Sequence, residues 1–230
     1  MQELRRYPRS VEVRQLAPGL WRWTAAHPDW TPADGGEEGW EPDVGCVYCE
    51  TDEGIVLVDP LVPAEPDERE RFWRALDRDV RRVGGAPTVL LTIYWHTRSA
   101  REVAARHAGA RVLACAAARE EMEARTDVGG WFQPGDPLPG GIEAYGTPHR
   151  HEVVFWLPSH GALVPGDVLL GDGAGGVRLL ADSSLGDVSR NDLLASLRPL
   201  LELPVERVLV SHGEPVLEGA REALARALAA

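Results

Sequence analysis

The sequence predicts an α/β fold in which β-sheets pack face to face and helices cover the outside. Short apolar runs typical of strands alternate with segments of helical periodicity along the chain. Each half of the chain has its own strand-rich stretch, and this order is typical of layered sandwiches. The chain has 230 residues, of which 44% are hydrophobic, so it can bury one full core, and we expect a single domain over residues 1–230.

The first half of the chain begins with strands and continues with alternating helices and strands. The apolar runs at 45–50 and 54–60 are joined by Thr-Asp-Glu, which predicts a hairpin. Apolar residues recur at helical spacing within 67–83, and two glycines follow this segment, which predicts a helix. The other elements expected here are strands at 11–13, 20–23, 88–94 and 111–115, and helices at 99–108 and 117–124.

The second half contains more predicted strand. A helix is expected to begin at Ser189, with Asp192 as its capping partner, and to end or kink at Pro199. A last helix is expected over 217–228. The predicted strands are 142–145, 152–157, 162–164, 177–180 and 207–211.

Charge and composition exclude several classes of function. The net charge of −12 and the pI of about 5.0 argue against nucleic acid as a partner, since a phosphate-binding surface needs clustered basic residues. The chain has no lysine, which excludes Schiff-base chemistry and a Walker-type phosphate loop. No apolar run is long enough to cross a bilayer, and residues 1–6 lack the apolar stretch of a signal peptide. We therefore expect no membrane partner and a cytoplasmic location.

Three cysteines are too few, and odd in number, for a disulfide framework. Cys46 and Cys49 have the spacing of a redox or zinc motif. They lie in a predicted strand, however, where residues three apart point to opposite faces. We therefore expect both thiols to be structural.

Histidine or aspartate follows an apolar strand at four places in the chain. These residues are His96, the pair His149 and His151, Asp167, and His212. Ligand sites in α/β folds form at the carboxyl ends of strands, and imidazole and carboxylate are the ligands that zinc or iron takes. The sequence therefore predicts one shared site. The remaining histidines are expected to be structural, namely His27, His107 and His160.

Together these motifs resemble the metallo-β-lactamase superfamily over nearly the whole chain. The predicted hairpin ending at Asp59 is similar to the opening strands of the family. VPGDVLLG is similar to the segment that supplies the bridging carboxylate, here Asp167, and LVSHGEP to the segment that supplies the last histidine, here His212. The resemblance implies a four-layer αββα sandwich of the metallo-β-lactamase type.

The hallmark loop of the family departs from its pattern in this chain. The family reads His-x-His-x-Asp-His after the central strand, whereas residues 94–99 read Tyr-Trp-His-Thr-Arg-Ser. Of the four family ligands in this loop, only the second histidine is kept, as His96. Tyr94 replaces the first histidine, Arg98 the aspartate and Ser99 the third histidine. The later Thr-Pro-Gly-His turn is one residue shorter here and ends at His149, with His151 as a second candidate.

The resemblance implies at most one metal ion. The first metal position keeps His96, His149 and Asp167, which suffices for one zinc, or iron or manganese. The second position keeps only Asp167 and His212, so a second metal is expected to be absent. A buried carboxylate left without its second cation needs another positive charge, and we expect Arg98 to turn inward and pair with Asp167.

The function expected from this site is hydrolysis of an ester, thioester or lactone-like bond in a small substrate. His212 would support Asp167 or the attacking water, and Tyr94 or Arg98 would polarise the substrate oxygen. The acidic loop at 34–43 would flank the cavity and disfavour strongly anionic substrates. The alternative is a metal-free, non-catalytic relative that binds a small ligand or serves in assembly. The sequence does not define an oligomeric state.

Overall fold

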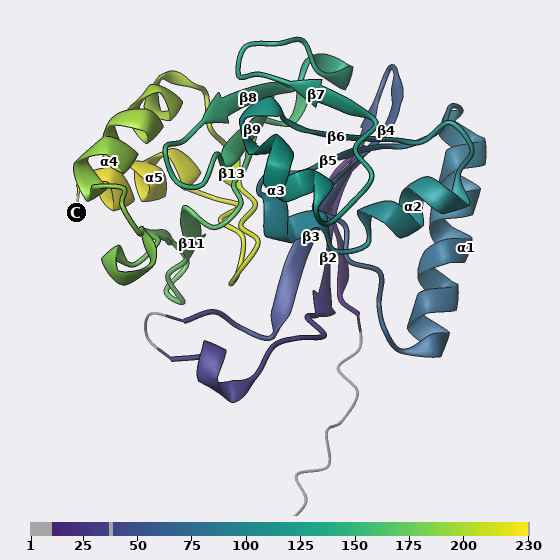
Figure 1. Ribbon diagram of the computed structural model, residues 1–230, viewed down its shortest axis with the longest axis horizontal. Helices are drawn as coiled ribbons and strands as arrows, with labels where there is room; N and C mark the ends of the chain where they lie inside the picture. The colour runs from purple at the N-terminus through teal and green to yellow at the C-terminus, as the bar shows by residue number, and fades with distance from the viewer. Residues whose placement is uncertain (1–10, 37–38, 230) are drawn as a thin grey trace, which may run out of the picture.

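The structure, a computed structural model, describes residues 11–36 and 39–229. Two large β-sheets lie at the centre of the molecule, with α1, α2 and α3 on one side and α4 and α5 on the other (Figure 1). The sequence predicted this mixed α/β arrangement, and it is confirmed.

The first sheet has seven strands that lie side by side in chain order. Neighbours from β1 to β4 are antiparallel, whereas those from β4 to β7 are parallel. Parallel neighbours need crossover connections, which α1 (Pro66–Val83), α2 (Ala100–Arg106) and α3 (Arg119–Glu123) provide. The strands are β1 (Val13–Ala17), β2 (Leu20–Ala26), β3 (Asp43–Thr51), β4 (Gly54–Val58), β5 (Thr88–Leu90), β6 (Arg111–Cys115) and β7 (Gly130–Phe132).

The second sheet has the strand order β13-β10-β9-β8, and a separate pair, β11 and β12, lies beside it. Its outer side is covered by α4 (Arg190–Leu197) and α5 (Ala220–Ala229). The strands are β8 (Glu143–Gly146), β9 (Val153–Leu157), β10 (Ala162–Val164), β11 (Leu169–Gly171), β12 (Val177–Leu179) and β13 (Arg207–Val208). The described residues also form short 3₁₀ helices at Pro32–Asp34, Tyr94–Thr97, Ala116–Ala118, Pro139–Gly141, Pro158–His160, Asp182–Ser184 and Arg198–Glu202.

Side chains point alternately to the two faces of each strand, and this alternation divides the interior into three cores. On β4, Ile55 and Leu57 pack towards the helices α1 to α3, while Val56 and Val58 pack between the two sheets. This period of two is what a strand requires when both of its faces are buried. Phe155 of β9 joins the core between the sheets, and its neighbours in β9 pack towards α4 and α5. The layers are therefore helix, sheet, sheet and helix.

The two cysteines of β3 follow the same rule. Cys46 packs in the core under the helices and Cys49 in the core between the sheets, and both thiols are buried and free. The expectation that they lie on opposite faces is confirmed.

Two strands are shorter than the sequence predicts because other groups take their hydrogen bonds. Beyond Leu90, the backbone N–H of Thr92 donates to the Asp59 carboxylate, and its carbonyl accepts from Val153 N. Beyond Val208, the carbonyl of Ser211 accepts from Gly45 N of β3. In both places the chain leaves the sheet where the candidate site begins.

Other boundaries also differ from the predicted ones. The short strands β7 and β11 were not predicted, and the first strand is Val13–Ala17 rather than 11–13. The expected cap of α4 is present, with Ser189 Oγ accepting from Asp192 N at 3.1 Å. At Pro199 the helix continues as a 3₁₀ turn, Arg198–Glu202. In the described part of the chain, none of the helices has both the length and the apolar character needed to cross a bilayer.

Candidate metal site

Three of the predicted residues converge at the edge where strands from both sheets end. His96 lies in the 3₁₀ turn after β5, Asp167 follows β10, and His212 follows β13. One ligand atom from each lies within 4.8 Å of the other two. All three side chains are largely buried, so rigid elements hold them in place.

Asp167 lies between the two imidazoles without forming a regular hydrogen bond to either. Its Oδ1 is 3.3 Å from His96 Nε2 and 3.1 Å from His212 Nε2, and it has no hydrogen-bond partner among the described residues. Its Oδ2 accepts from Trp95 Nε1 at 2.5 Å. A buried carboxylate oxygen that faces two ring nitrogens in this way matches the donor set of a divalent metal. The residues present therefore fit one metal ion.

The carboxylate of Asp59 fixes the orientation of the His96 ring. Asp59 Oδ2 is 2.8 Å from His96 Nδ1, and Asp59 itself accepts from the backbone N–H and the hydroxyl of Thr92. This contact places a proton on Nδ1, so Nε2 is the nitrogen directed at Asp167. Metal-binding histidines are commonly held by a carboxylate in this manner.

The charges of the three groups are strongly linked. Burial disfavours ionisation of Asp167, but the adjacent His96 and His212 hold its pKa well below the usual range. Burial also disfavours the charged form of His96, but Asp167 and Asp59 together raise its pKa to about 9. Burial lowers the pKa of His212, with partial compensation from Asp167. Without a metal, the positive charge that Asp167 requires would be a proton on His96.

His149 lies in the same cavity but outside the three-residue cluster. It is buried, and neither ring nitrogen has a hydrogen-bond partner among the described residues. Burial, and then the charge of Arg150, lower its pKa, so the ring is neutral and able to act as a ligand. His151 is exposed and does not line the cavity. Of the two candidates, His149 is therefore the one near the site.

Arg98 turns inward as expected, but its partners differ from the predicted one. Its guanidinium donates to the carbonyls of Gly45 (3.4 Å) and Asp59 (3.1 Å) and to Ser211 Oγ (2.8 Å). No hydrogen bond or ion pair to Asp167 is found in the described residues, where Trp95 is the donor to that carboxylate. The expected pairing of Arg98 with Asp167 is therefore absent. Arg98 instead ties together the ends of β3, β4 and β13.

The other two substituted positions of the loop have distinct surroundings. Ser99 Oγ accepts from Val62 N at 2.9 Å and so holds the segment after β4. Tyr94 is half-buried at the wall of the cavity, and its hydroxyl accepts from Arg150 at 3.3 Å. Both residues expected to polarise a substrate oxygen line the cavity, but Arg98 uses its terminal nitrogens on protein acceptors.

Two buried charged residues near the site were not predicted from the sequence. Glu152 is fully buried behind Asp167, with Oε1 accepting from Val168 N at 3.0 Å. Burial, and then the charge of Asp167, raise the pKa of Glu152 to about 8. Arg22 is also buried and donates to Gly213 O at 2.8 Å. The sequence did contain a signal for Glu152, because this charged residue stands at the start of a fully apolar strand.

The backbone is strained around the site. Among the described residues, the non-glycine residues with positive φ are Asp59, Arg98, Arg150 and His151. The first two lie in the site, and the other two directly follow His149. Such conformations cost on the order of 1–3 kcal/mol each and cluster at functional sites. Their position agrees with the site identified from the side chains.

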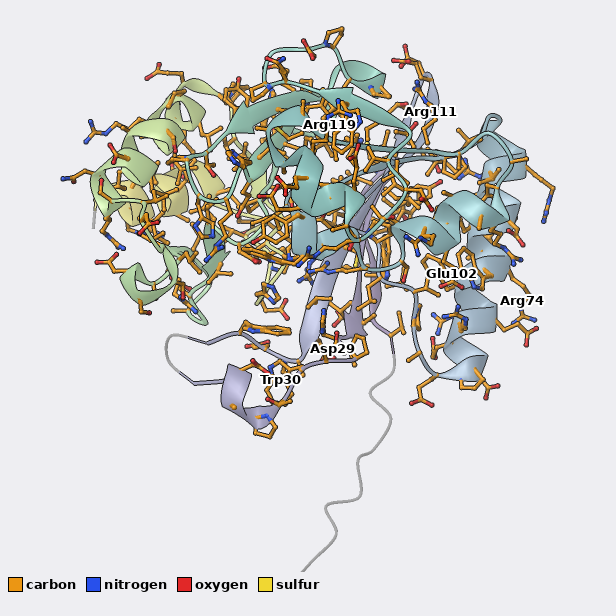
Figure 2. The ribbon with its side chains drawn as sticks, in the orientation of Figure 1. Asp29, Trp30, Arg74, Glu102, Arg111 and Arg119 are labelled. Carbon is orange, nitrogen blue, oxygen red and sulfur yellow. The ribbon has the colours of Figure 1, made fainter. Side chains whose placement is uncertain are left out.

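The site opens into a cavity of about 1130 Å³. Its walls come from the loop between β2 and β3, the turn after β5, and the segments around 149–150, 167 and 212. Figure 2 labels Asp29 and Trp30 in the first of these loops, beyond the ends of β2 and β3. His27, expected to be structural, lines this cavity and packs edge-on against Trp40, which in turn packs against His212.

The protein is an αββα sandwich with a candidate metal site of two histidines and one carboxylate, buried where the strands end. Comparisons with known proteins identify the family. The model of the metallo-beta-lactamase superfamily matches residues 42–230. The chain belongs to the metallo-beta-lactamase superfamily. A comparison with curated proteins finds no match.

Solved structures with the same fold cover almost the whole chain. A metallo-beta-lactamase from Pontibacter korlensis is 19% identical, with a TM-score of 0.68 over 96% of this chain and 98% of that chain. One from Hirschia baltica is 16% identical, with a TM-score of 0.69 over 96% and 97%. FIM-1 from Pseudomonas aeruginosa, in its mono-zinc form, is 16% identical, with a TM-score of 0.65 over 96% and 95%. At these identities the similarity establishes the fold.

Proposed function

We propose that the protein is a hydrolase that uses one divalent metal, held by His96, Asp167 and His212 with His149 close by, to cleave an ester, thioester or lactone-like bond. The observation that carries this proposal is the convergence of three ligand atoms within 4.8 Å, with Asp167 Oδ1 lacking a hydrogen-bond partner in the described part of the chain. This set replaces the expected one of His96, His149 and Asp167, in which His212 had a supporting role. The donor set of two imidazoles and a carboxylate suits zinc, and also iron or manganese.

Different residues of the chain would have different roles at such a site. A divalent metal held there would supply Lewis acidity towards a carbonyl oxygen and towards a nucleophilic water. Asp59 holds the His96 ring so that Nε2 faces the site. The Tyr94 hydroxyl, whose oxygen accepts from Arg150, keeps its own proton for donation to a substrate oxygen.

A single metal is proposed because the residues at two ligand positions of the family are engaged elsewhere. Arg98 bonds to main-chain carbonyls and Ser211, and Ser99 accepts from Val62 N. Neither side chain is an anionic or imidazole ligand. The mono-zinc form of FIM-1 is a precedent for one ion in this fold.

The alternative, a metal-free ligand-binding protein, also has an observation in its favour. Asp167 already accepts from Trp95, and a protonated His96 between Asp59 and Asp167 would balance the buried charge without a metal. The two proposals differ in what they predict for metal content.

The deciding experiment is elemental analysis of protein purified without chelators, combined with thermal melts with and without zinc. We expect one ion per chain and stabilisation that reaches about 4 kcal/mol at a thousandfold excess over Kd. His212→Ala should abolish the zinc-dependent shift, whereas the control His160→Ala, outside the cavity, should keep it. Two tightly held ions would contradict the single-metal proposal. An absence of both metal and shift would favour the metal-free alternative.

A further inference from the structure

The cavity above the metal site has a charge opposite to that of the protein as a whole. The chain carries a net charge of −12, yet the charged residues that line this cavity, within the described ranges 11–36 and 39–229, are four arginines and two aspartates. They are Arg69, Arg98, Arg125, Arg150, Asp29 and Asp167. Positive charge inside a cavity of an acidic protein attracts anions to that place.

Two of these arginines gather around one aromatic side chain. The guanidinium of Arg125 lies 4.8 Å from the centre of the Tyr94 ring, and Arg150 donates to the Tyr94 hydroxyl at 3.3 Å. Arg125 comes from the turn after α3 and Arg150 from the turn between β8 and β9, so different parts of the chain bring them together. The Tyr94 face and hydroxyl hold both cations beside the cavity.

In the part of the chain that the structure describes, neither arginine forms an ion pair with a carboxylate. Arg125 donates only to the Glu121 carbonyl, and Arg150 only to Tyr94, among the described residues. Arg69, by contrast, forms an ion pair with Glu102, and Arg101 and Arg119 pair with acids outside the cavity. Two arginines that lack an ion-pair partner among the residues the structure describes have donors free for a ligand, and the planar guanidinium fits carboxylate and phosphate oxygens.

The aromatic residues connect this pair to the metal site. Arg150 also lies 5.7 Å from the Trp95 ring, and Trp95 Nε1 donates to Asp167. Tyr94 and Trp95 pack edge to face at 4.7 Å. A substrate whose charged end lies on Arg125 and Arg150 would therefore have its other end in the same cavity as His96, Asp167 and His212.

We propose that Arg125 and Arg150 form an oxyanion-binding subsite, and that the substrate is an ester-type compound carrying a carboxylate or phosphate away from the bond that is cleaved. This inference rests on the proposed hydrolase function and names its substrate class. It replaces the expectation that the acidic loop at 34–43 disfavours anions. Asp34 accepts from Thr31 in its own turn, and Glu41 does not line the cavity. Glu37 and Glu38 lie outside the described residues.

The test compares two esters of equal length, mono-4-nitrophenyl glutarate and 4-nitrophenyl valerate, in the metal-loaded protein. Each ester reacts with one water to give the carboxylate, 4-nitrophenolate and two protons. We expect a higher kcat/KM for the glutarate ester. Arg125→Gln and Arg150→Gln should each reduce this preference about fivefold to tenfold, as expected for one charge-assisted contact. Arg119→Gln is the matched control and should keep the preference. Figure 2 shows Arg119 in the upper part of the view and Asp29, which lines the cavity, in the lower part.

Calorimetric titration with glutarate and with inorganic phosphate separates failure of this inference from failure of the proposed function. Equal rates for the two esters would overturn the subsite and leave the hydrolase proposal intact. If neither ester is cleaved, binding of glutarate or phosphate that both variants lose would support the subsite without catalysis. Absence of binding in the unaltered protein would then overturn the subsite. A preference for one of the two anions identifies the charged group of the substrate.

Discussion

The candidate ligands are held in place by three further residues, Asp59, Thr92 and Glu152. Asp59 receives two hydrogen bonds from Thr92 and contacts His96, so one carboxylate links the end of β4 to the turn after β5. Glu152 accepts from Val168 N and holds the loop that carries Asp167. A Cβ at Gly166 would lie 2.8 Å from both Glu152 Oε1 and Thr92 Oγ1, so this loop needs a glycine where it passes between them.

The contact between Asp59 and His96 leads to a prediction about metal affinity. Asp59→Asn keeps the size of the side chain but removes the charge that holds the Nδ1 proton of His96. We expect zinc affinity to fall about 10- to 100-fold, the usual cost of losing a carboxylate behind a metal-binding histidine. Competition with a chromophoric chelator measures the change. Asp136→Asn, which alters a carboxylate in an exposed turn, is the control and should leave the affinity unchanged. Equal affinity in both variants would show that Asp59 does not orient a ligand.

At the scale of elements, the sequence predicted most strands and helices because their apolar residues follow regular periods. The strand β6 matches its prediction, and α1 begins one residue earlier than expected. The ends of β5 and β13 could not be predicted. They end where a side chain or another strand takes their hydrogen bonds, and those partners are distant in sequence.

The site was predictable to a similar degree. Histidine and aspartate at strand ends indicated His96, Asp167 and His212, which the structure brings together. The inward direction of the Arg98 side chain could be inferred from the need of buried Asp167 for a positive charge. The hydrogen-bond partners of Arg98 could not be inferred. They depend on how closely β3 and the segment after β13 approach each other, as the bond from Gly45 N to Ser211 O shows.

This approach of β3 to the His212 segment leads to a prediction about Gly45. Arg22 of β2 passes over Gly45 to reach the carbonyls of Val210 and Gly213, and a Cβ at Gly45 would lie 2.6 Å from its Nη2. Gly45→Ala should therefore displace the buried guanidinium and cost about 1–3 kcal/mol of stability, as overpacking does. It should also weaken zinc binding, because the displaced guanidinium would no longer hold the carbonyl of Gly213, the residue next to His212.

Urea unfolding and zinc titration of Gly45→Ala test both effects. Gly129→Ala is the matched control, since a Cβ there would meet its neighbours at 3.6 Å, an ordinary contact. Loss of stability with unchanged zinc affinity would mean that Arg22 supports the fold without positioning His212.

At the scale of the whole molecule, the core between the sheets joins the two halves of the chain. It contains Val47, Val56 and Leu90 from the first sheet and Phe155 and Val164 from the second. Neither sheet could keep its inner face buried without the other. The metal-site candidates lie at the edge of this shared core, since His96 comes from the first half and Asp167 and His212 from the second. The site can therefore form only when both halves are folded together.

This dependence predicts one cooperative unfolding transition, and Phe155→Ala tests it. Phe155 is fully buried between the sheets, with its ring 5.9 Å from that of Phe132. Its truncation should cost about 3–5 kcal/mol, as for other buried phenylalanines. Because the core is shared, circular dichroism and tryptophan fluorescence should still report the same midpoint. Val13→Ala, at a side chain that is 54% exposed, should change stability by no more than about 0.5 kcal/mol. Two separated transitions in Phe155→Ala would show that the halves fold independently and that the single-domain prediction is wrong.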